Sequence, residues 1–334
     1  MKGIDIKELN ISMTTQMVEL LMKRQEKEIE SFKDLLNDKL DRKEILSKLD
    51  EYFAKDKIVG FGAFNEEKLV GYMFGQIKFD GTRGKHVWIP YEGIAAEGIV
   101  EEIIWKLYAE ASKHWLDWGC FSHYVSAPIG DQRYVSIFQR LSFAFEQVHA
   151  ILDINKYKPF EASEGIKVRL GNKEDADIIS GMADIIFSFQ NASPVYTPAY
   201  PDYVFKVRKG YRGIVDDEDI ILLFAEKNGK ELGFQEYEPC DINLMVPENA
   251  IELSIAGTFA TEMGRGVGKK LMNEAAILLK EKGYQYIVND WRITNISSST
   301  FWPKCGFIPV YYRMQRVIDP RVAWANFNNP VLKR

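Results

Sequence analysis

The sequence has little of what marks several large classes of protein. Only three of its 334 residues are cysteines (Cys120, Cys240 and Cys305), and they lie far apart in no Cys-x-x-Cys pair. So sparse and odd a set predicts neither a disulfide framework nor a zinc site, and it favours a reducing compartment. No apolar run approaches the roughly 18 residues that a spanning helix needs, and the stretch from Met1 to Leu9 has no apolar core of a secretory signal. We therefore expect a cytoplasmic protein without a membrane partner.

An excess of basic residues is also missing. Lysine and arginine number 43 against 48 aspartates and glutamates, which gives a net charge of −5. This argues against a nucleic-acid partner, because binding to the phosphate backbone needs a dense Lys/Arg surface. A mildly acidic surface suits a cationic or amine substrate slightly better, although solubility alone explains it. The 46% hydrophobic and 27% charged residues are typical of a soluble globular protein, and the length predicts about two domains.

What is present is an internal repeat. Each half has a short strand, helical segments, a hairpin, a strand, a long amphipathic helix, a strand, a short helix and two closing strands. Val70-Gly71-Tyr72 corresponds to Leu232-Gly233-Phe234 at an offset of 162, and Leu141-Ser142-Phe143 to Cys305-Gly306-Phe307 at an offset of 164. We interpret the chain as two copies of one α+β unit, residues 1–160 and 165–334, with a linker near 157–165.

The strongest local signal follows the strand expected at 251–259. It is the run Thr258-Phe-Ala-Thr-Glu-Met-Gly-Arg-Gly-Val-Gly-Lys-Lys-Leu-Met272, in which a glycine-rich loop leads into an amphipathic helix. Such a junction brings unpaired backbone N–H groups and a positive helix end together, and closely spaced glycines let the backbone approach a phosphate. The run therefore indicates a pyrophosphate or similar anion, with Lys269 and Lys270 adding positive charge.

Two familiar phosphate motifs do not fit this loop. A Walker A loop requires Ser or Thr after Gly-Lys, and Gly268-Lys269 is followed by Lys270. A dinucleotide fingerprint requires a third glycine where Lys269 or Leu271 stands, and its βαβ unit is not expected here. A glycine-rich connection without a ligand remains the plain alternative.

The run from 251 to 307 resembles the acetyl-CoA-binding core of the GNAT N-acetyltransferase superfamily. Its loop pattern, (Gln/Arg)-x-x-Gly-x-(Gly/Ala), is matched by 263–268 except at Met263, and its later motif is matched by Asn295, Ser298, Gly306 and Phe307, with Trp302 at the tyrosine position. Residues 295, 298 and 302 fall on one helix face, which Pro303 is expected to end or kink. The whole resembles a tandem GNAT protein: two domains, each a mixed, mostly antiparallel sheet flanked by helices.

The resemblance implies an acetyl-CoA-dependent N-acetyltransferase that acts on a small amine, with acetyl-CoA as co-substrate and no metal. Acetyl-CoA would lie where the strand at 251–259 diverges from the strand at 284–290. The implied cofactor-binding residues are Thr258, Phe259, Ala260, Met263, Gly264, Arg265, Gly266, Val267, Gly268, Lys269, Asn295, Ser298 and Trp302. A monomer or homodimer is expected. A non-catalytic acyl-CoA-binding or regulatory module is the alternative.

The acid and the base are less well defined by the sequence. Relatives use a tyrosine where Trp302 stands, and an indole cannot protonate a thiolate, so Tyr311, Tyr312 or water must substitute. All four histidines (86, 114, 123 and 149) lie in the first half, so the second half has no histidine base of its own, and their spacing supports no metal site. Glu252 and Asp290 are the carboxylate candidates, with solvated strand-end charges as the alternative. Cys305 is expected to be a small buried apolar residue.

The first copy lacks the site. An offset of 164 maps Asn295 to Asp131, Ser298 to Tyr134, Trp302 to Phe138 and Gly257 to Gly93, but maps the glycine loop to 100–104, which has Glu101 and Glu102 and no glycine. Negative charge there repels pyrophosphate, so we expect no CoA binding in this copy. In the second copy the Pro- and Tyr-rich stretch 193–203 is a candidate aromatic wall for an amine acceptor, or else a packed loop.

Overall fold

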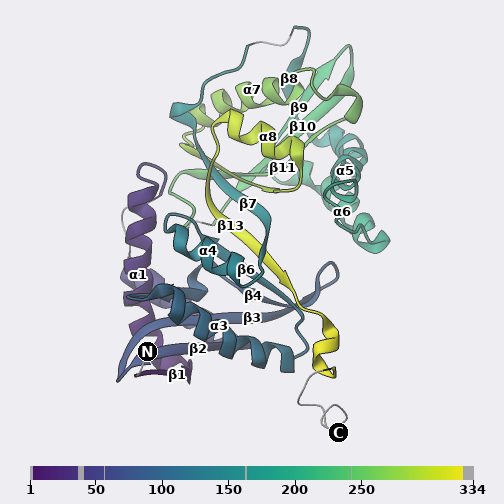
Figure 1. Cartoon of the computed structure of the whole chain (residues 1–334). Helices are drawn as coiled ribbons and strands as arrows, with labels where there is room; N and C mark the ends of the chain where they lie inside the picture. The colour runs from purple at the N-terminus through teal and green to yellow at the C-terminus, as the bar shows by residue number, and fades with distance from the viewer. Residues whose placement is uncertain (1–2, 37–40, 56, 162–163, 242, 326–334) are drawn as a thin grey trace. The chain divides into compact units, whose positions relative to one another are not determined.

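The computed structural model describes residues 3–36, 41–55, 57–161, 164–241 and 243–325 (Figure 1). The chain forms two compact units. The first consists of residues 1–146 together with 311–334, and the second consists of residues 147–310. Among the described residues, no helix has the length and apolarity that crossing a membrane requires.

The first unit is a mixed sheet flanked by helices (Figure 1). Its strands pair in the order β1-β2-β3-β4-β6-β13, antiparallel except for the parallel pair β4–β6, and the short β5 also pairs with β3. Its core lies between the sheet and α3. The elements are β1 (Ile4–Glu8), α1 (Thr14–Ser31), α2 (Arg42–Phe53), β2 (Ile58–Asn65), β3 (Lys68–Asp80), β4 (Gly84–Ile89), β5 (Ile94–Ala96), α3 (Val100–Asp117), β6 (Ser122–Pro128) and α4 (Gln132–Arg140), with the 3-10 turns η1 (Ile11–Met13) and η2 (Tyr91–Gly93).

The second unit repeats this plan. Its strands pair in the order β8-β9-β10-β11-β12-β7, and only β11–β12 is parallel. A core of apolar side chains joins α5 and α6 to β9 and β10. The elements are β8 (Lys167–Leu170), α5 (Ala176–Asn191), α6 (Pro201–Gly213), β9 (Ile221–Lys227), β10 (Lys230–Pro239), β11 (Ala250–Thr258), α7 (Val267–Glu281), β12 (Tyr286–Arg292) and α8 (Ile296–Cys305), with the 3-10 turns η3 (Ile154–Lys156), η4 (Lys173–Asp175), η5 (Ile214–Asp216) and η6 (Ala260–Glu262). A last 3-10 turn, η7 (Pro320–Ala323), ends the part of the first unit that is described. The predicted α+β fold, with mixed, mostly antiparallel strand pairing flanked by helices, is confirmed.

The two units exchange strands. The sequence predicts two short strands at the end of each half, but β7 (Ala144–Asp153) and β13 (Ile308–Val317) are each continuous. Residues 147–153 of β7 pair with β12 in the second unit, and residues 311–317 of β13 pair with β6 in the first. The compact units therefore differ from the predicted domains 1–160 and 165–334 in two strands. Residues 147–153 of β7 belong to the second unit, and residues 311–317 of β13 belong to the first. Of the expected linker 157–165, residues 162 and 163 lie outside the described part of the chain.

Local sequence explains several turns and helix ends. Asn228 and Gly229 adopt positive φ (54° and 74°) in the tight hairpin between β9 and β10, as their sequence predicts. At α8, however, the expected end at Pro303 is wrong. The helix continues to Cys305 and ends at Gly306, whose φ of 98° suits glycine.

Candidate functional site

The glycine loop of the second unit connects β11 to α7. Gly264 and Gly266 have φ of 76° and 86°, a left-handed conformation that side chains disfavour, and Gly266 is the N-cap of α7. A Cβ at Gly268 would lie 3.1 Å from the Phe301 ring, so this glycine lets α7 approach α8 closely. Gly266 has no side chain with which to cap the helix, and the first N–H groups of a helix have no intrahelical acceptor. The loop thus presents backbone donors at a positive helix end.

The strands beside this loop diverge. The parallel pairing of β11 with β12 runs from Ala250–Tyr286 to Leu253–Asn289 and then stops, although β11 continues to Thr258 and β12 to Arg292. On its other side β11 stays paired with β10 as far as Thr258. The divergence expected between these strands is present.

Two residues of β11 direct backbone groups to the diverging side. The Phe259 N–H donates to the Leu232 carbonyl oxygen of the neighbouring strand at 3.0 Å. Because hydrogen-bonded pairs alternate along antiparallel strands, the N–H and C=O of Thr258 and of Ala256 point away from β10. Thr258 was expected here. Ala256 was missed, because strand alternation shows only once the register is known, and the N–H of Phe259 is already used.

Helix α8 brings three predicted residues to one face. Asn295 is its N-cap, and its side-chain oxygen accepts from the Ser298 N–H at 3.2 Å. Trp302 is buried, with its ring centroid 4.8 Å from that of Phe301 and 5.6 Å from that of Phe307. The asparagine therefore has a structural task as a cap, and Trp302 is an apolar part of the core. Buried Cys305, whose thiol pKa burial raises, fits the expectation of a small apolar residue.

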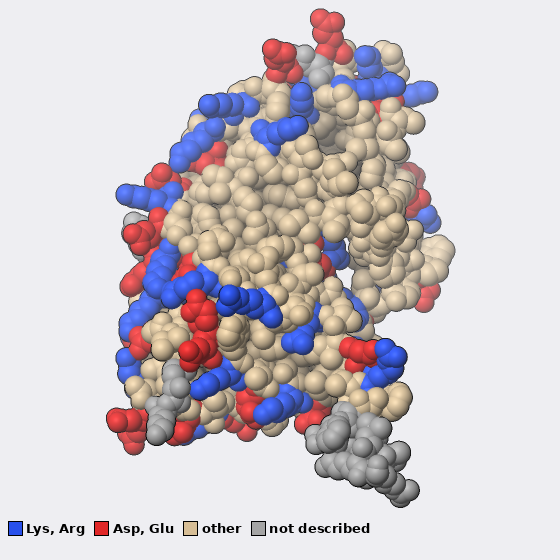
Figure 2. All heavy atoms as spheres, viewed as in Figure 1, with Lys and Arg blue, Asp and Glu red and all other residues tan. Residues whose placement is uncertain are grey.

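Basic side chains lie near the start of α7. Lys269 Nζ lies 5.3 Å from the centroid of the Phe160 ring, Lys270 pairs with Glu274, and Arg265 Nη1 lies 3.3 Å from Glu262 Oε2. Figure 2 shows several basic side chains on the viewed face over the region of α7. Of the other predicted residues, Met263 is exposed, Ala260 begins η6 and Val267 is buried as the first residue of α7. The two glutamates Glu262 and Glu274 leave the charge of this end mixed.

Carboxylates gather on the strands next to the divergence. Glu252 on β11 lies directly opposite Glu238 on β10. Burial, followed by the charges of Asp290 and Glu238, raises the pKa of the Glu252 carboxyl to about 7. A carboxylate with that pKa accepts and releases protons near neutral pH. The raised pKa favours a general base over a solvated strand-end charge, and the role of Glu252 stays a prediction.

The structure adds a histidine that sequence reasoning assigned to the other half. His149 lies on β7, opposite Asp290 on β12, with its Nδ1 3.8 Å from the Asp290 carboxylate. His149 therefore belongs to the second compact unit, although the second half of the sequence has no histidine of its own. No local signal in the sequence indicates this pairing, because β7 crosses between the units.

The two predicted tyrosines lie in the first unit. Tyr311 pairs with Pro128 of β6, and its ring contacts that of Tyr91. The ring of Tyr312 packs against Phe145 with centroids 4.8 Å apart, and burial raises its pKa. Glu252 and Asp290 lie in the second unit. The role of either tyrosine as an acid stays a prediction.

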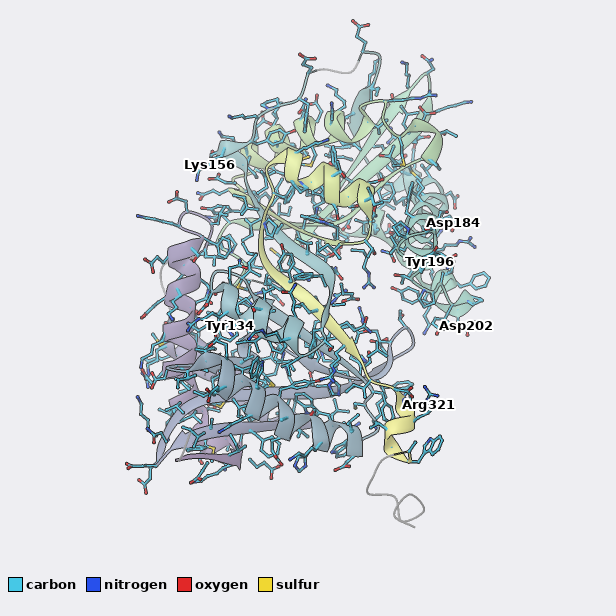
Figure 3. The ribbon with its side chains drawn as sticks, viewed as in Figure 1. Tyr134, Lys156, Asp184, Tyr196, Asp202 and Arg321 are labelled. Carbon is cyan, nitrogen blue, oxygen red and sulfur yellow. The ribbon has the colours of Figure 1, made fainter. Side chains whose placement is uncertain are left out.

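The Pro- and Tyr-rich stretch joins α5 to α6 and begins the latter. Tyr196, Tyr200 and Tyr203 are all exposed. Figure 3 shows Tyr196 and Asp202 at the α6 end and Asp184 on α5, where an ion pair with Arg208 (2.8 Å) links the two helices. The ring of Tyr203 packs edge-to-face against Phe187, with centroids 6.1 Å apart. The part of the three tyrosines in an acceptor site stays a prediction.

The corresponding region of the first unit is built differently. Gly71–Ala96 and Gly233–Thr258 are equivalent strand pairs, so Ala96 corresponds to Thr258 and Ile94 to Ala256. Residues 97–99 connect β5 to α3, whereas residues 259–266 connect β11 to α7. The mapping of the glycine loop onto 100–104 is therefore wrong: those residues lie inside α3, and the loop itself is shortened.

Side chains fill the space next to β5. The Arg24 guanidinium of α1 donates to the carbonyl oxygens of Tyr91 (2.6 Å) and Ile94, and the Tyr134 hydroxyl accepts from the Ala96 N–H at 3.2 Å. Glu28 accepts from the N–H groups of Gly130 and Asp131 at 2.7 and 2.9 Å. Arg24, Glu28 and Tyr134 are all buried. Two of the backbone groups equivalent to those that face the diverging side in the second unit, the Ile94 C=O and the Ala96 N–H, are thus already bonded in the first.

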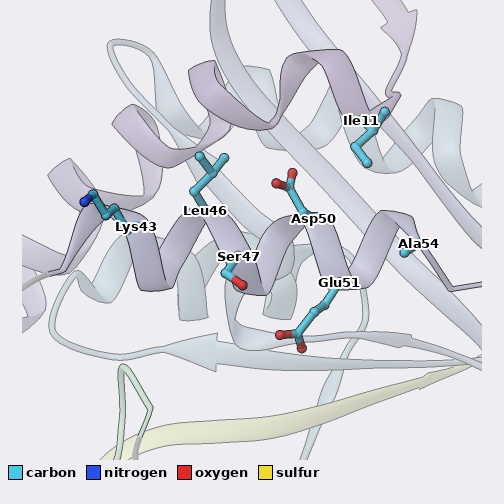
Figure 4. A pocket seen from close by; sticks show the side chains of 7 residues that line it. All are labelled: Ile11, Lys43, Leu46, Ser47, Asp50, Glu51 and Ala54. Carbon is cyan, nitrogen blue, oxygen red and sulfur yellow. The ribbon is translucent and has the colours of Figure 1, made fainter.

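A surface hollow of about 460 Å³ lies elsewhere in the first unit, between α2 and Ile11 (Figure 4). Its lining includes Lys43, Asp50 and Glu51, and none of the predicted site residues. No group of three or more His, Cys, Asp or Glu side chains within the described ranges is arranged to hold a metal ion.

Comparison with known proteins identifies the fold. No family model matches the sequence, and no curated protein sequence matches it. Among solved structures, a GCN5-related N-acetyltransferase from Sphaerobacter thermophilus aligns over 96% of this chain and 97% of its own, with a TM-score of 0.62 and 9% identity. A tandem GNAT protein from the clavulanic acid biosynthesis pathway aligns over 94% and 98%, with a TM-score of 0.51 and 12% identity.

A third structure is the GCN5-related glucosamine N-acetyltransferase region of a fungal multi-domain GH3 β-N-acetylglucosaminidase. It aligns over 94% of this chain and 38% of that one, with a TM-score of 0.55 and 15% identity. Likeness at these identities establishes fold and leaves activity open. The chain has the GNAT fold in tandem form, as its motifs predict.

Proposed function

We propose that the second unit is an acetyl-CoA-dependent N-acetyltransferase that acetylates a primary amine of a small molecule by direct attack. The observation that carries this proposal is the divergence of β11 from β12 beside a glycine-rich helix start, with Glu252 on the same strand. The N-acetyltransferase names of the matched structures support the reaction class.

The residues present fit acetyl-CoA at two points. The outward N–H and C=O groups of Ala256 and Thr258 suit the amide groups of the pantetheine arm, as a further strand would pair with them. The backbone N–H groups at the start of α7, with Lys269 beside them, suit the pyrophosphate, whereas the Arg265 N–H already donates to the Glu262 carbonyl oxygen. Asn295 and Ser298 would border the arm on the α8 side, and buried Trp302 would close its apolar end.

The chemistry requires little beyond positioning and one base. Acetyl-CoA supplies a thioester, whose C–S bond breaks as the amine nitrogen bonds to the carbonyl carbon. Glu252 takes the proton that the ammonium group must lose, directly or through water, and its raised pKa suits that role. The thiolate leaves and takes up a proton, for which Trp302 is unsuited. Tyr311, Tyr312 or water would supply it, while His149 and Asp290 would orient groups beside the base.

The test is thiol release from acetyl-CoA by the full chain across a panel of amines, alongside acetyl-CoA binding by calorimetry. Turnover with at least one amine is expected. Binding without turnover on any amine would favour the acyl-CoA-binding or regulatory module, for which the packing of Trp302 against Phe301 and Phe307 is the motivating observation. Failure to bind acetyl-CoA would refute both functions.

A further inference from the structure

A row of carboxylates crosses one face of the second unit's sheet. Glu236 and Glu238 are two residues apart on β10 and therefore point to the same face. Glu252 lies opposite Glu238, and its neighbour Ser254 is the extra residue of a β-bulge facing Glu236. Asp290 of β12 lies close enough for its charge to raise the pKa of Glu252. The row therefore extends from Glu236 to the base proposed above.

Glu236 is the unusual member of this row. Its side chain is 1% exposed, and its Oε2 has no hydrogen-bond partner within the part of the chain that the structure describes. The Ser254 hydroxyl bonds to the carboxylate, yet burial and the charges of Glu238 and Glu252 still raise the pKa of Glu236 to about 8. An unpaired buried carboxylate costs folding free energy, which a protein keeps at functional sites.

Within the described residues, the charges that chiefly act on Glu236 and Glu252 are those of other carboxylates: Glu238, Glu252 and Asp217 on Glu236, and Asp290 and Glu238 on Glu252. His149 lies beside Asp290, away from Glu236 along the row. Like charges directly opposite each other, such as Glu238 and Glu252, destabilise a sheet. Nor are these side chains, within the described ranges, arranged as a set of metal ligands. A cation from outside, with N–H donors, would satisfy both the charge and the unpaired oxygen.

We propose that the acceptor is a diamine or polyamine, whose second, non-reacting ammonium group is bound by Glu236 together with Glu238 while the reacting amine lies at Glu252. This inference rests on the proposed acetyltransferase function. An ammonium group beside Glu236 lowers the raised pKa of its carboxyl, and the ionised carboxylate binds the ammonium through N⁺–H···O⁻ hydrogen bonds, which are stronger than neutral ones. The exposed Ser254 and Asp290 leave the row open to solvent on either side of Glu252.

The spacing of the carboxylates restricts the distance between the two nitrogens of the amine. Glu236 and Glu252 are diagonal neighbours across the β10–β11 pair, a separation of about 7–8 Å between Cα atoms. A short aliphatic chain between two nitrogens spans this distance, whereas two amines on one carbon do not. In the reaction, the reacting ammonium loses one proton to Glu252, and the free amine then bonds to the acetyl carbon as the C–S bond breaks. The second proton on that nitrogen is released as the amide forms, the CoA thiolate takes up a proton to leave as the thiol, and the other nitrogen keeps its charge throughout.

The experiment compares putrescine with n-butylamine, which has the same carbon chain and one amine. Thiol release by the full chain gives kcat/KM for each. We expect putrescine to be preferred by roughly 10- to 100-fold, the value of a hydrogen bond to a charged group. The Glu236→Gln variant is expected to abolish that ratio through KM for putrescine. The exposed Glu174 provides the matched control, because Glu174→Gln removes the same charge away from the row and should leave the ratio unchanged.

The outcomes separate the inference from the function on which it rests. Acetylation of both amines at equal kcat/KM, or an unchanged ratio in Glu236→Gln, overturns the diamine proposal and leaves the acetyltransferase standing. No acetyl-CoA binding refutes the function itself. Calorimetry with Mg²⁺ and Ca²⁺ adds a third arm: a divalent ion that binds the wild type, is lost in Glu236→Gln and competes with putrescine would make the row a metal site and overturn the proposal.

Discussion

The two units have equivalent strands and helices, but the connections from β5 to α3 and from β11 to α7 differ in length and in glycine content. In the second unit, residues 259–266 contain two glycines with positive φ, one of which is the N-cap of α7. In the first unit, residues 97–99 make the same connection, and Glu101 and Glu102 occupy the first turn of α3. The short connection has no room for a loop that surrounds a phosphate.

The edges of β5 and β11 extend the contrast. Ala256 and Thr258 direct backbone groups to the side of β11 where its pairing with β12 has stopped, while Ile94 and Ala96 bond to Arg24 and Tyr134. Helix α5 carries no lysine or arginine, so the second unit has no counterpart of Arg24 on that helix. The cofactor groove proposed for the second unit thus has no counterpart in the first, because the loop is shorter there and two long side chains bond to the equivalent backbone groups.

The largest expected effect concerns the base. Glu252→Gln should lower kcat about 100- to 10,000-fold while acetyl-CoA binding is retained. Because the carboxyl must be ionised to accept a proton and its pKa is about 7, wild-type kcat/KM should fall as pH drops through 7. Steady-state kinetics from pH 5.5 to 9 would measure this. A variant of Glu92, the buried glutamate preceding β5, is the control: Glu92→Gln should keep full activity. A flat wild-type profile would remove Glu252 from this role.

The second prediction concerns Arg24, one of the buried side chains that occupy the space next to β5 in the first unit. Arg24→Ala should destabilise it by about 3–5 kcal/mol, since Glu28 then loses its buried counter-charge and the carbonyls of Tyr91 and Ile94 lose their donor. Urea denaturation followed by tryptophan fluorescence would detect the loss. If this variant binds a second acetyl-CoA and keeps its stability, Arg24 is not the structural replacement of a cofactor in the first unit.

A smaller effect separates the two loops. Gly264 and Gly98 have nearly the same φ, 76° and 74°, and a Cβ at either would meet open space. Glutamate therefore adds the same strain and the same charge at both positions. Gly264→Glu should weaken acetyl-CoA binding roughly 10- to 100-fold through repulsion of the pyrophosphate, while Gly98→Glu should have no effect. Calorimetry on the two variants measures their affinity for acetyl-CoA. If both substitutions weaken binding equally, each unit has a CoA site.

The smallest expected effect is that of one hydroxyl. Tyr134→Phe leaves the Ala96 N–H without its acceptor and should cost about 1 kcal/mol of stability in the first unit. Chemical denaturation measures this, and acetyl-CoA affinity should stay at the wild-type value. A stability equal to that of the wild type would show that the Tyr134 hydroxyl is not needed to occupy the groove.

Much of this could be predicted because the signals are local. The Asn228-Gly229 turn, the glycine loop before α7 and the Asn295 cap each depend on a few adjacent residues. What could not be predicted depends on pairing between distant segments. His149 reaches the second unit only through the register of β7 on β12, and the outward groups of Ala256 follow from the Phe259–Leu232 bond. The shortened loop was mapped wrongly because a constant offset cannot represent a deletion.

The exchanged strands have a consequence for how the chain is made. As the chain leaves the ribosome, the first unit lacks its last sheet strand until residues 311–317 follow the whole of the second unit. The first unit therefore cannot complete its sheet before the second unit has been synthesised. Residues 165–310 on their own would lack the β7 strand that borders β12. Selection for the active site proposed in the second unit is thus enough to preserve the half of the sequence that supplies this strand.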